Sequence, residues 1–271
     1  MKIGIFDSGY GGLTILREIR RLLPQYDYIY LGDNARAPYG SRSFDVVYQY
    51  TLEAVKRLFD LDCRLVIIAC NTASAKALRS IQQRDLPNID PTRRVLGVII
   101  PTVEAIDGLS TSRHIGVMAT QGTVDSHSYR LEVTKIHPEM SVTELACPMF
   151  VPLIENGETD TPGADWFVEK YCRQMMQADP LLDTLILGCT HYPVIIEQIR
   201  DHMPQRVKVV AQGDIVARSL ADYLLRHPEI ETAISRGGSL EYLTTESPLK
   251  FNSIASRFMP DEVNAHKITL P

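Results

Sequence analysis

Two short apolar segments, each followed at once by a cysteine, constrain the fold of this chain more than any other feature. Residues 65–69 precede Cys70 and residues 185–188 precede Cys189, and a small polar residue comes next in both places. Apolar segments of this length that end in turn and capping residues are typical of buried parallel strands. Because open α/β sheets bind ligands beyond the carboxyl ends of their strands, both thiols are predicted at the ligand-binding end.

The repeated context separates these two cysteines from the other three. A single cysteine after a strand is most often a small buried hydrophobic residue. Cys63, Cys147 and Cys172 lack the strand-cysteine-helix pattern, so we expect structural roles for them. Five cysteines in 271 residues do not resemble a dense disulfide framework, and free thiols are expected. The pattern indicates one active site with a thiol on each side.

Alternating strands and helices are predicted along the chain, which indicates an α/β fold. The predicted strands are residues 2–6, 28–31, 64–69, 95–100, 114–119, 142–145, 184–187 and 207–211. The predicted helices are residues 11–23, 43–59, 124–136, 164–176 and 215–226, with a further helix after each of Cys70 and Cys189. Pro101 is expected to end the fourth strand.

The chain is expected to form two parallel-sheet α/β domains with the active site in the cleft between them. Residues 1–97 and 208–271 are assigned to the first domain and residues 98–207 to the second. The strand at 207–211, the helix after it and the tail through Phe258 are expected to return to the first sheet. The chain would then cross twice between the domains.

Composition narrows the classes of protein and partner. A hydrophobic content of 45% over 271 residues is enough for a substantial core. The formal net charge of −5 gives no broad cationic surface, so no nucleic-acid partner is expected. No apolar run approaches the roughly 18 residues of a membrane span, and the first residues do not resemble a signal peptide. We expect a cytoplasmic protein without a membrane partner, and the sequence leaves a homodimer open.

Four motifs carry a resemblance to a known enzyme family. They are residues 6–13, 38–40, 69–74 and 188–193. Together they span most of the chain, which resembles the glutamate racemases of the cofactor-independent aspartate/glutamate racemase superfamily. The resemblance implies interconversion of L-glutamate and D-glutamate, which supplies D-glutamate for peptidoglycan. It also implies two α/β domains that enclose the substrate, with no cofactor and no metal.

Proton chemistry gives an independent reason for two thiols. Inversion of a stereocentre by proton transfer requires removal of the α-proton on one face and delivery on the other, so one thiol on each side suffices. An ordinary thiol, with a pKa of about 8.5, is only a few per cent thiolate at neutral pH. We therefore expect a helix N-terminus or a cation to lower the pKa of each thiol. Backbone and side-chain donors must also support the carbanion.

The resemblance implies a role for each candidate catalytic residue. Cys70 would remove the proton of D-glutamate and Cys189 that of L-glutamate, each acting as the acid in the reverse direction. Asp7 would support Cys70, and His191 with Glu155 would support Cys189. Alternative roles stay open from the residues alone: a helix cap for Asp7, an ordinary satisfied histidine for His191, and a solvated loop carboxylate for Glu155.

The candidate substrate-binding residues are polar or glycine residues beside the thiols and in nearby loops. They are Asp7, Ser8, Tyr39, Gly40, Asn71, Thr72, Thr190 and His191, with Thr120 and Thr123 as secondary candidates. The Tyr39-Gly40 segment is expected to bind through backbone amides. Simple helix capping or a turn explains several of these positions equally well, and capping and binding can coexist.

Other functions remain open at the level of sequence. A cysteine hydrolase could use either thiol with His191, although the second thiol would then be unexplained. A metal-binding protein could use Cys70, Cys189 and His191, but no close cysteine pair supports a structural zinc site. A noncatalytic amino-acid-binding or protein-interaction module would keep the cleft without turnover. Aspartate racemase is the nearest alternative within the superfamily.

Overall fold

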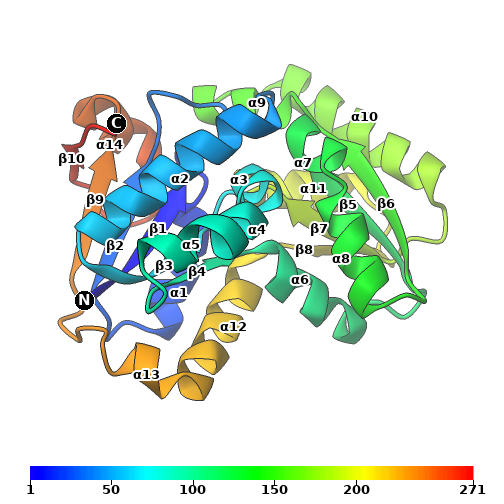
Figure 1. The fold of residues 1–271 in the computed structure, drawn as a ribbon. Helices are drawn as coiled ribbons and strands as arrows, with labels where there is room; N and C mark the ends of the chain where they lie inside the picture. The colour runs from blue at the N-terminus through cyan, green and yellow to red at the C-terminus, as the bar shows by residue number, and fades with distance from the viewer. Residues whose placement is uncertain (271) are drawn as a thin grey trace.

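Two parallel β-sheets, each covered by helices, make up the computed structural model, which describes residues 1–270 (Figure 1). The first sheet contains β1 (Lys2–Asp7), β2 (Tyr28–Gly32), β3 (Cys63–Ile68), β4 (Arg94–Gly97), β9 (Leu240–Thr244) and β10 (Ala265–Lys267). The second contains β5 (His114–Ala119), β6 (Ser141–Ala146), β7 (Thr184–Gly188) and β8 (Lys208–Val210). The strand orders are β10-β9-β2-β1-β3-β4 and β6-β5-β7-β8. The predicted α/β fold class with two parallel sheets is confirmed.

The α-helices lie between the strands in the sequence and cover the sheets in space. In chain order they are α1 (Leu13–Leu22), α2 (Phe44–Asp60), α3 (Asn71–Lys76), α4 (Leu78–Ser80), α5 (Leu86–Ile89), α6 (Ile99–Ala105), α7 (Gln121–Asp125), α8 (Ser128–Ile136), α9 (Phe150–Asn156), α10 (Pro162–Ala178), α11 (Ile196–His202), α12 (Gly213–Arg226), α13 (Pro228–Glu231) and α14 (Pro248–Ala255). No helix among residues 1–270 is long and apolar enough to cross a membrane.

The central strand β1 shows why the apolar segments become buried strands. Its side chains alternate between the two faces of the sheet. Ile3 and Ile5 belong to the same core cluster as Leu16 of α1, whereas Phe6 belongs to a second cluster with Val47 of α2. Both faces are therefore covered, and an uninterrupted apolar strand is the stable solution. This burial fixes the strand ends from which the polar residues emerge.

The strand at 207–211 was expected in the first sheet, and this prediction is wrong. The observed strand, β8, pairs with β7 at the edge of the second sheet, with Leu185 opposite Val209. The chain crosses to the first sheet only afterwards, where α12 packs against α1. Gly213 permits the close approach, because a Cβ atom there would lie 2.7 Å from Cγ of Glu18. The division into two domains stays a prediction, but its second boundary must lie after β8 and not at residue 208.

Two further element boundaries differ from the sequence prediction. The strand expected at 95–100 ends at Gly97, and Pro101 lies in the first turn of α6. A proline is tolerated there because the first turn needs no backbone N–H donors. The helix expected at 124–136 is two helices, α7 and α8, separated near His127, whose φ of 52° places it in the left-handed region.

Candidate active site

Three strand ends bring the candidate catalytic residues together. Asp7 is the last residue of β1, Cys70 lies two residues beyond β3, and Cys189 follows β7 directly. Because β1 and β3 are neighbours, Asp7 and Cys70 lie at the same edge of the first sheet. The second sheet meets this edge, since the Thr190 hydroxyl donates to Oδ1 of Asp7 at 3.3 Å. The two predicted thiol positions thus belong to one contiguous cluster.

Cys70 is a buried thiol at the N-terminus of α3. Its Sγ lies 3.4 Å from Oγ of Ser8 and accepts the backbone N–H of Ala73 at 3.5 Å, so the thiol caps the helix. Burial and the negative charge of Asp7 raise the pKa of Cys70 to about 12, although the Ser8 and Ala73 bonds oppose this. The expected lowering by the helix N-terminus is outweighed in this protein.

Asp7 is fully buried and connects the two sides of the cluster. Its Oδ2 accepts the N–H of Gly9 at 2.9 Å, while Oδ1 accepts from Thr190. Burial raises the pKa of Asp7, and the positive charge of His191 acts in the opposite direction. The alternative role of helix cap is not observed, because α1 has no side-chain cap. A buried carboxyl with a raised pKa can exchange protons closer to neutral pH than an ordinary aspartate.

The imidazole of His191 lies beside Cys189, and the carboxylate of Glu155 binds the other nitrogen of that ring. Nδ1 of His191 lies 3.9 Å from Sγ of Cys189, and Nε2 lies 2.8 Å from Oε1 of Glu155. Burial lowers the pKa of His191, but the bonds to Cys189 and Glu155 outweigh it and raise the pKa to about 10. The ring is therefore protonated at neutral pH. Thiol, imidazole and carboxylate form a chain along which a proton can move.

The backbone after Cys189 differs from the backbone after Cys70. The α-helix expected directly after Cys189 is absent there, and a 3₁₀ turn at Tyr192–Ile195 comes before α11. Thr190 caps no helix in this arrangement and its hydroxyl bonds Asp7 instead. Each cysteine therefore lies just beyond the end of its own strand, but only Cys70 lies at the N-terminus of a helix. The neighbouring groups also differ in charge, because Asp7 acts on Cys70 and His191 lies beside Cys189.

Three threonine hydroxyls form a second polar group beside the thiols. Oγ1 of Thr72 lies 2.8 Å from Oγ1 of Thr120 and 3.3 Å from Oγ1 of Thr123. Thr120 also caps α7 by accepting the N–H of Thr123, so capping and side-chain contact do coexist. A Cβ atom on Gly40 would lie 2.9 Å from Cβ of Thr120. The threonines and the loop at Gly40 therefore pack together.

The loop at residues 38–40 meets the second sheet's helices through its backbone. The carbonyl of Gly40 accepts the N–H of Gly122 at 2.7 Å. The Tyr39 hydroxyl is already used, because it donates to Oδ2 of Asp33 at 2.5 Å and the ring is buried. Substrate contact through the backbone amides of this loop stays a prediction.

Two features of the site were not found by sequence reasoning. Gly11 touches the second half of the cluster, since a Cβ atom there would lie 2.3 Å from Oγ1 of Thr190 and 2.4 Å from Nδ1 of His191. The paired glycines Gly11 and Gly12 after β1 are the sequence signal for this close approach. The Asn71 amide bonds Gln212 and Tyr129, which no local sequence pattern connects to Cys70.

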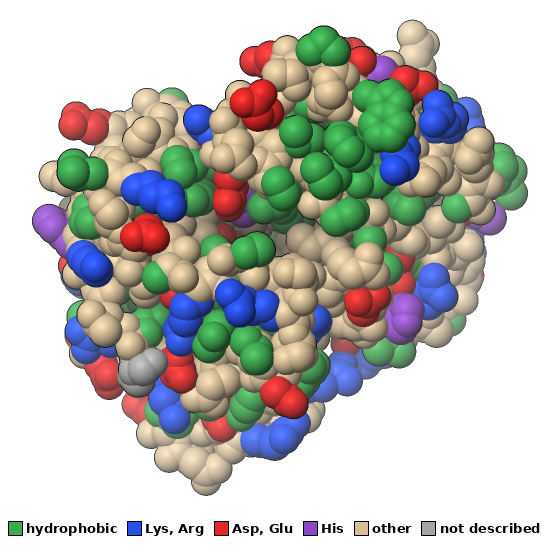
Figure 2. Space-filling view, turned by 90° about the horizontal axis from the view of Figure 1, so that it is seen from above, with side chains coloured by type: hydrophobic (Ala, Val, Ile, Leu, Met, Phe, Trp, Pro, Cys, Tyr) green, Lys and Arg blue, Asp and Glu red, His purple; other side chains and the backbone are tan. Residues whose placement is uncertain are grey.

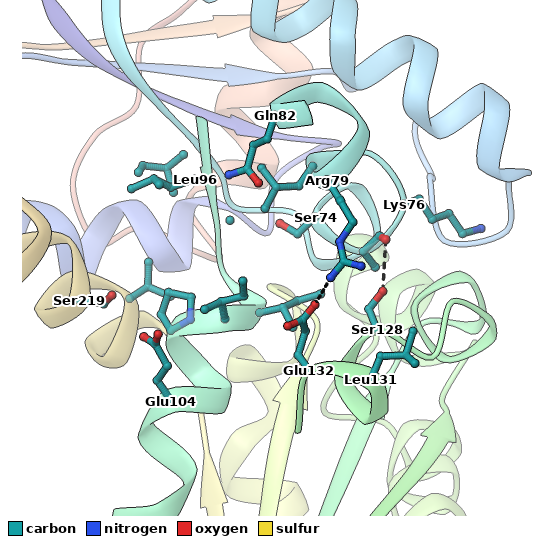
Figure 3. A pocket seen from close by; sticks show the side chains of 18 of the residues that line it. Ser74, Lys76, Arg79, Gln82, Leu96, Glu104, Ser128, Leu131, Glu132 and Ser219 are labelled. Atoms are coloured by element: carbon teal, nitrogen blue, oxygen red, sulfur yellow. Dashed lines mark hydrogen bonds and ion pairs between the residues drawn. The ribbon is translucent and has the colours of Figure 1, made fainter. Parts of the chain in front are cut away.

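A cavity of about 420 Å³ lies apart from the thiols, between α3, α6, α8 and α12. Its lining includes Ser74, Leu96, Glu104 and Ser219, together with Arg79 and Glu132, whose ion pair is drawn in Figure 3. Neither Cys70 nor Cys189 belongs to its lining. The predicted chemistry is therefore concentrated in the buried cluster and not in this cavity.

Metal-ligating side chains gather elsewhere among the residues that the structure describes. Asp107, His137 and Glu139 are the one group there whose ligand atoms all lie within 4.8 Å of one another. None of them is a predicted site residue. The alternative in which Cys70, Cys189 and His191 hold a metal therefore gains no support from the geometry.

One thiol follows a strand of each sheet, with Asp7 near Cys70 and His191 beside Cys189, which is the arrangement expected from the resemblance to racemases that use two thiols. The protein-family model for Asp/Glu/hydantoin racemases matches residues 11–220. The chain belongs to this family.

Relatives and solved structures agree with that assignment. The chain is 41% identical over 258 residues to a glutamate racemase of Geobacter metallireducens, covering 95% of this chain and 92% of the relative. It is 39% identical over 269 residues to one of Roseobacter denitrificans, covering 96% and 97%. A Bacillus anthracis glutamate racemase structure is similar with a TM-score of 0.90 and 31% identity, covering 100% and 98%. One from Francisella tularensis in complex with D-glutamate has a TM-score of 0.88 and 32% identity, covering 99% and 97%.

Proposed function

We propose that this protein interconverts L- and D-glutamate with two thiols, one of which removes the α-proton while the other delivers its own proton to the opposite face. The observation that carries the proposal is the bond between Thr190 and Asp7, which joins the Cys189 side of the cluster to the Cys70 side. The substrate is supported by near-full-length relatives named glutamate racemases and by a similar structure that contains D-glutamate. The product D-glutamate would serve peptidoglycan synthesis.

On the Cys70 side, Asp7 and Ser8 support proton transfer to and from D-glutamate. The thiolate of Cys70 takes the proton from the α-carbon, and the electron pair stays on that carbon as a carbanion. Burial and Asp7 keep Cys70 protonated at neutral pH, because they raise its pKa to about 12. The α-ammonium group of the substrate adds a positive charge that favours the thiolate. Asp7 can then hold the released thiol proton.

On the Cys189 side, His191 and Glu155 act as the supporting pair. The thiol of Cys189 delivers its proton to the opposite face of the carbanion, which completes the inversion to L-glutamate. Nδ1 of His191 faces the sulfur and Glu155 holds Nε2, so the imidazole can return a proton to Cys189. In the reverse direction the two thiols exchange the roles of base and acid. The overall reaction consumes and releases no proton.

Hydrogen-bond donors must stabilise the carbanion and the substrate carboxylates. The proposed donors are Ser8, Asn71 and Thr72, with the backbone at Tyr39-Gly40 and with Thr120 and Thr123 as secondary contacts. Thr190 is also a proposed contact, and its hydroxyl would have to exchange its bond to Asp7 for one to the substrate. Donors held in place by a buried cluster stabilise developing charge without reorganising, which is where most of the rate enhancement arises. Thiol acid-base chemistry alone would contribute only about 10²–10⁴-fold.

Several broader features belong to the same proposal. Residues 1–97 and 211–271 would form one catalytic domain and residues 98–210 the other, because β8 pairs in the second sheet. The five cysteines are free thiols, as is usual for proteins of the reducing cytoplasm. The reaction would need no cofactor and no metal, since the thiols and donors supply each proton transfer. A homodimer stays a prediction.

A chiral assay on the purified protein tests the proposed function. L-glutamate, L-aspartate and their enantiomers are supplied separately without any added cofactor, and products are separated by chirality. We expect racemisation of glutamate in both directions and at least tenfold slower turnover of aspartate. Faster turnover of aspartate than of glutamate would instead indicate an aspartate racemase. A covalent acyl-enzyme with water-dependent product, or binding without turnover, would replace the proposal by a hydrolase or a binding module.

A further inference from the structure

A closed ring of three hydrogen bonds holds the side chain of Asn71, the residue after Cys70. Asn71 donates through Nδ2 to Oε1 of Gln212 at 2.6 Å, and Gln212 donates through Nε2 to the Tyr129 hydroxyl at 2.8 Å. Tyr129 completes the ring by donating to Oδ1 of Asn71 at 2.7 Å. All three side chains are buried. Because each member donates to the next, the bonds strengthen one another.

The surroundings of Gln212 fix the direction of the ring. Nε2 of Gln212 also donates to Oγ1 of Thr102 at 2.8 Å, and Thr102 in turn donates to the carbonyl of Val98 at 2.7 Å. The Gln212 amide must therefore present its oxygen to Asn71, which sets the Asn71 amide as well. Burial raises the pKa of Tyr129, so its hydroxyl stays protonated as a donor. The second N–H of Asn71 remains available to a ligand.

The ring connects Cys70 to the segments that join the two sheets. Asn71 begins α3, which Cys70 caps, and Tyr129 lies in α8 beside the second sheet. Gln212 lies directly before α12, where the chain returns to the first sheet, and Thr102 lies in α6 on the outgoing crossing. The returning crossing therefore contacts Asn71 directly through Gln212, and the outgoing crossing is linked to it through the bond between Gln212 and Thr102.

We propose that Gln212 and Tyr129 are positioning residues for the proton transfer at Cys70. They do not touch the thiol. They hold the Asn71 amide and the first turn of α3, and through that turn the position of Sγ relative to the α-carbon of the substrate. This inference rests on the proposed function, because it concerns one of the two proton transfers of glutamate racemisation.

Isotope effects can separate this role from a general structural one. Enantiomers have equal free energies in water, so any variant lowers kcat/KM equally in both directions. The rate alone does not reveal which thiol was affected. If only the Cys70 step slows, the α-deuterium effect on kcat/KM increases with D-glutamate, whose deuteron Cys70 removes. It decreases with L-glutamate, whose deuteron Cys189 removes.

The test uses full-length Tyr129→Phe and Gln212→Met variants with Tyr28→Phe as the matched control. Tyr28 is also buried and donates one hydrogen bond, to the carbonyl of Leu23 at 2.6 Å, but it lies outside the site. We expect kcat/KM to fall about 10–100-fold in both ring variants, as for a misplaced reacting group. The α-deuterium effect should change in opposite directions for the two substrate enantiomers. The control should keep wild-type isotope effects.

The remaining outcomes are also decisive. Wild-type isotope effects in both ring variants overturn the inference, whatever their stability, because a loss of folded enzyme lowers the rate without changing an isotope effect. Equal increases with both enantiomers also overturn it, since they place the ring behind both thiols. In both cases the proposed function still stands if the wild-type protein racemises glutamate. If the wild-type protein does not racemise glutamate, the proposed function fails and the inference fails with it.

Discussion

Five buried cysteines offer an internal comparison at the scale of single residues. We expect Cys70→Ala and Cys189→Ala to lower racemisation by about 10²–10⁴-fold, because each removes one acid-base group. Cys63→Ala, Cys147→Ala and Cys172→Ala should retain turnover, since none of these thiols is hydrogen-bonded to Asp7, Ser8 or His191 among the described residues, and those of Cys147 and Cys172 donate to backbone carbonyls. Circular dichroism of glutamate measures the loss of optical activity directly.

Stability must be measured alongside activity for this set of variants. All five side chains are buried, so each truncation leaves a small cavity and costs some free energy of unfolding. Urea unfolding identifies variants that lose activity only by unfolding. Near-wild-type turnover in a folded Cys70→Ala or Cys189→Ala variant would contradict the assignment of the two thiols.

The ion pair of His191 with Glu155 predicts a pH dependence of stability. The folded pKa of His191 is raised to about 10, above its ordinary value of 6.5, so the folded state holds this proton more tightly. The resulting stabilisation is complete below about pH 6.5 and is lost as the pH rises through about 10. We expect Glu155→Gln to lower the free energy of unfolding by about 1.5–3 kcal/mol at pH 6 and by much less at pH 10. Urea unfolding across this range measures the difference.

Glu158→Gln is the matched control for this measurement. Glu158 lies three residues further on, is exposed, and its side chain has no hydrogen-bond or ion-pair partner among residues 1–270. Its substitution should change stability little at any pH. A constant difference between wild type and Glu155→Gln from pH 6 to pH 10 would show that this pair does not set the pKa of His191.

At the scale of elements, the turn between β1 and α1 must approach the second half of the site closely. A side chain on Gly11 would displace Thr190 and His191, because its Cβ would lie 2.3 and 2.4 Å from their polar atoms. We expect Gly11→Ala to lower kcat/KM by at least about tenfold, since small displacements of reacting groups are costly. Gly108→Ala should be neutral, because a Cβ atom on Gly108 would have no neighbouring atom within 4 Å.

A direct measurement separates displacement from unfolding in the glycine pair. Both variants should show the far-ultraviolet spectrum of the wild type, while only Gly11→Ala loses turnover. Wild-type kcat/KM in Gly11→Ala would mean that Thr190 and His191 can move aside without consequence, and that their positions do not matter to the reaction.

The sequence predicts elements best where burial alone decides their structure. β1, β3 and β7 are apolar segments covered on both faces, and their positions were found. The predicted end of β4 was wrong, because no local sequence pattern separates a proline in the first turn of a helix from a proline that ends a strand. The prediction that β8 belongs to the first sheet was wrong as well, because the sequence of a three-residue edge strand carries too little pattern to choose between two sheets.

The same distinction applies to the site. Cys70 and Cys189 follow buried strands and could be placed from the sequence, whereas the roles expected for Asp7, His191 and Glu155 came from the family resemblance. Gln212 could not be connected to the thiols, because its bond to Asn71 joins positions 141 residues apart. The direction of the Cys70 pKa shift was also missed. It depends on burial and on the nearby Asp7 charge, which outweigh the favourable helix N-terminus.

At the scale of the whole molecule, the site exists only where the two sheets meet (Figure 1). Thr14 on α1 donates to the carbonyl of Thr190 at 2.9 Å, and the carbonyl of Gly40 accepts from Gly122. These bonds join the two halves on either side of the thiols. The face seen from above has a hollow near its middle, with hydrophobic side chains gathered on one side of it and charged side chains of both signs around it (Figure 2). Relative placement of the two halves therefore determines whether the thiols face each other across one substrate.

The most direct test of the two-thiol account is the position of deuterium during early turnover in heavy water. The thiol that donates to the product already carries solvent deuterium, while the thiol that removed the substrate proton can return that same proton. Starting from L-glutamate, newly formed D-glutamate should contain α-deuterium well before the remaining L-glutamate does. The asymmetry should reverse when D-glutamate is the starting material. Efficient transfer of the original α-hydrogen into the opposite enantiomer, in both directions, would indicate a single proton carrier and contradict the account.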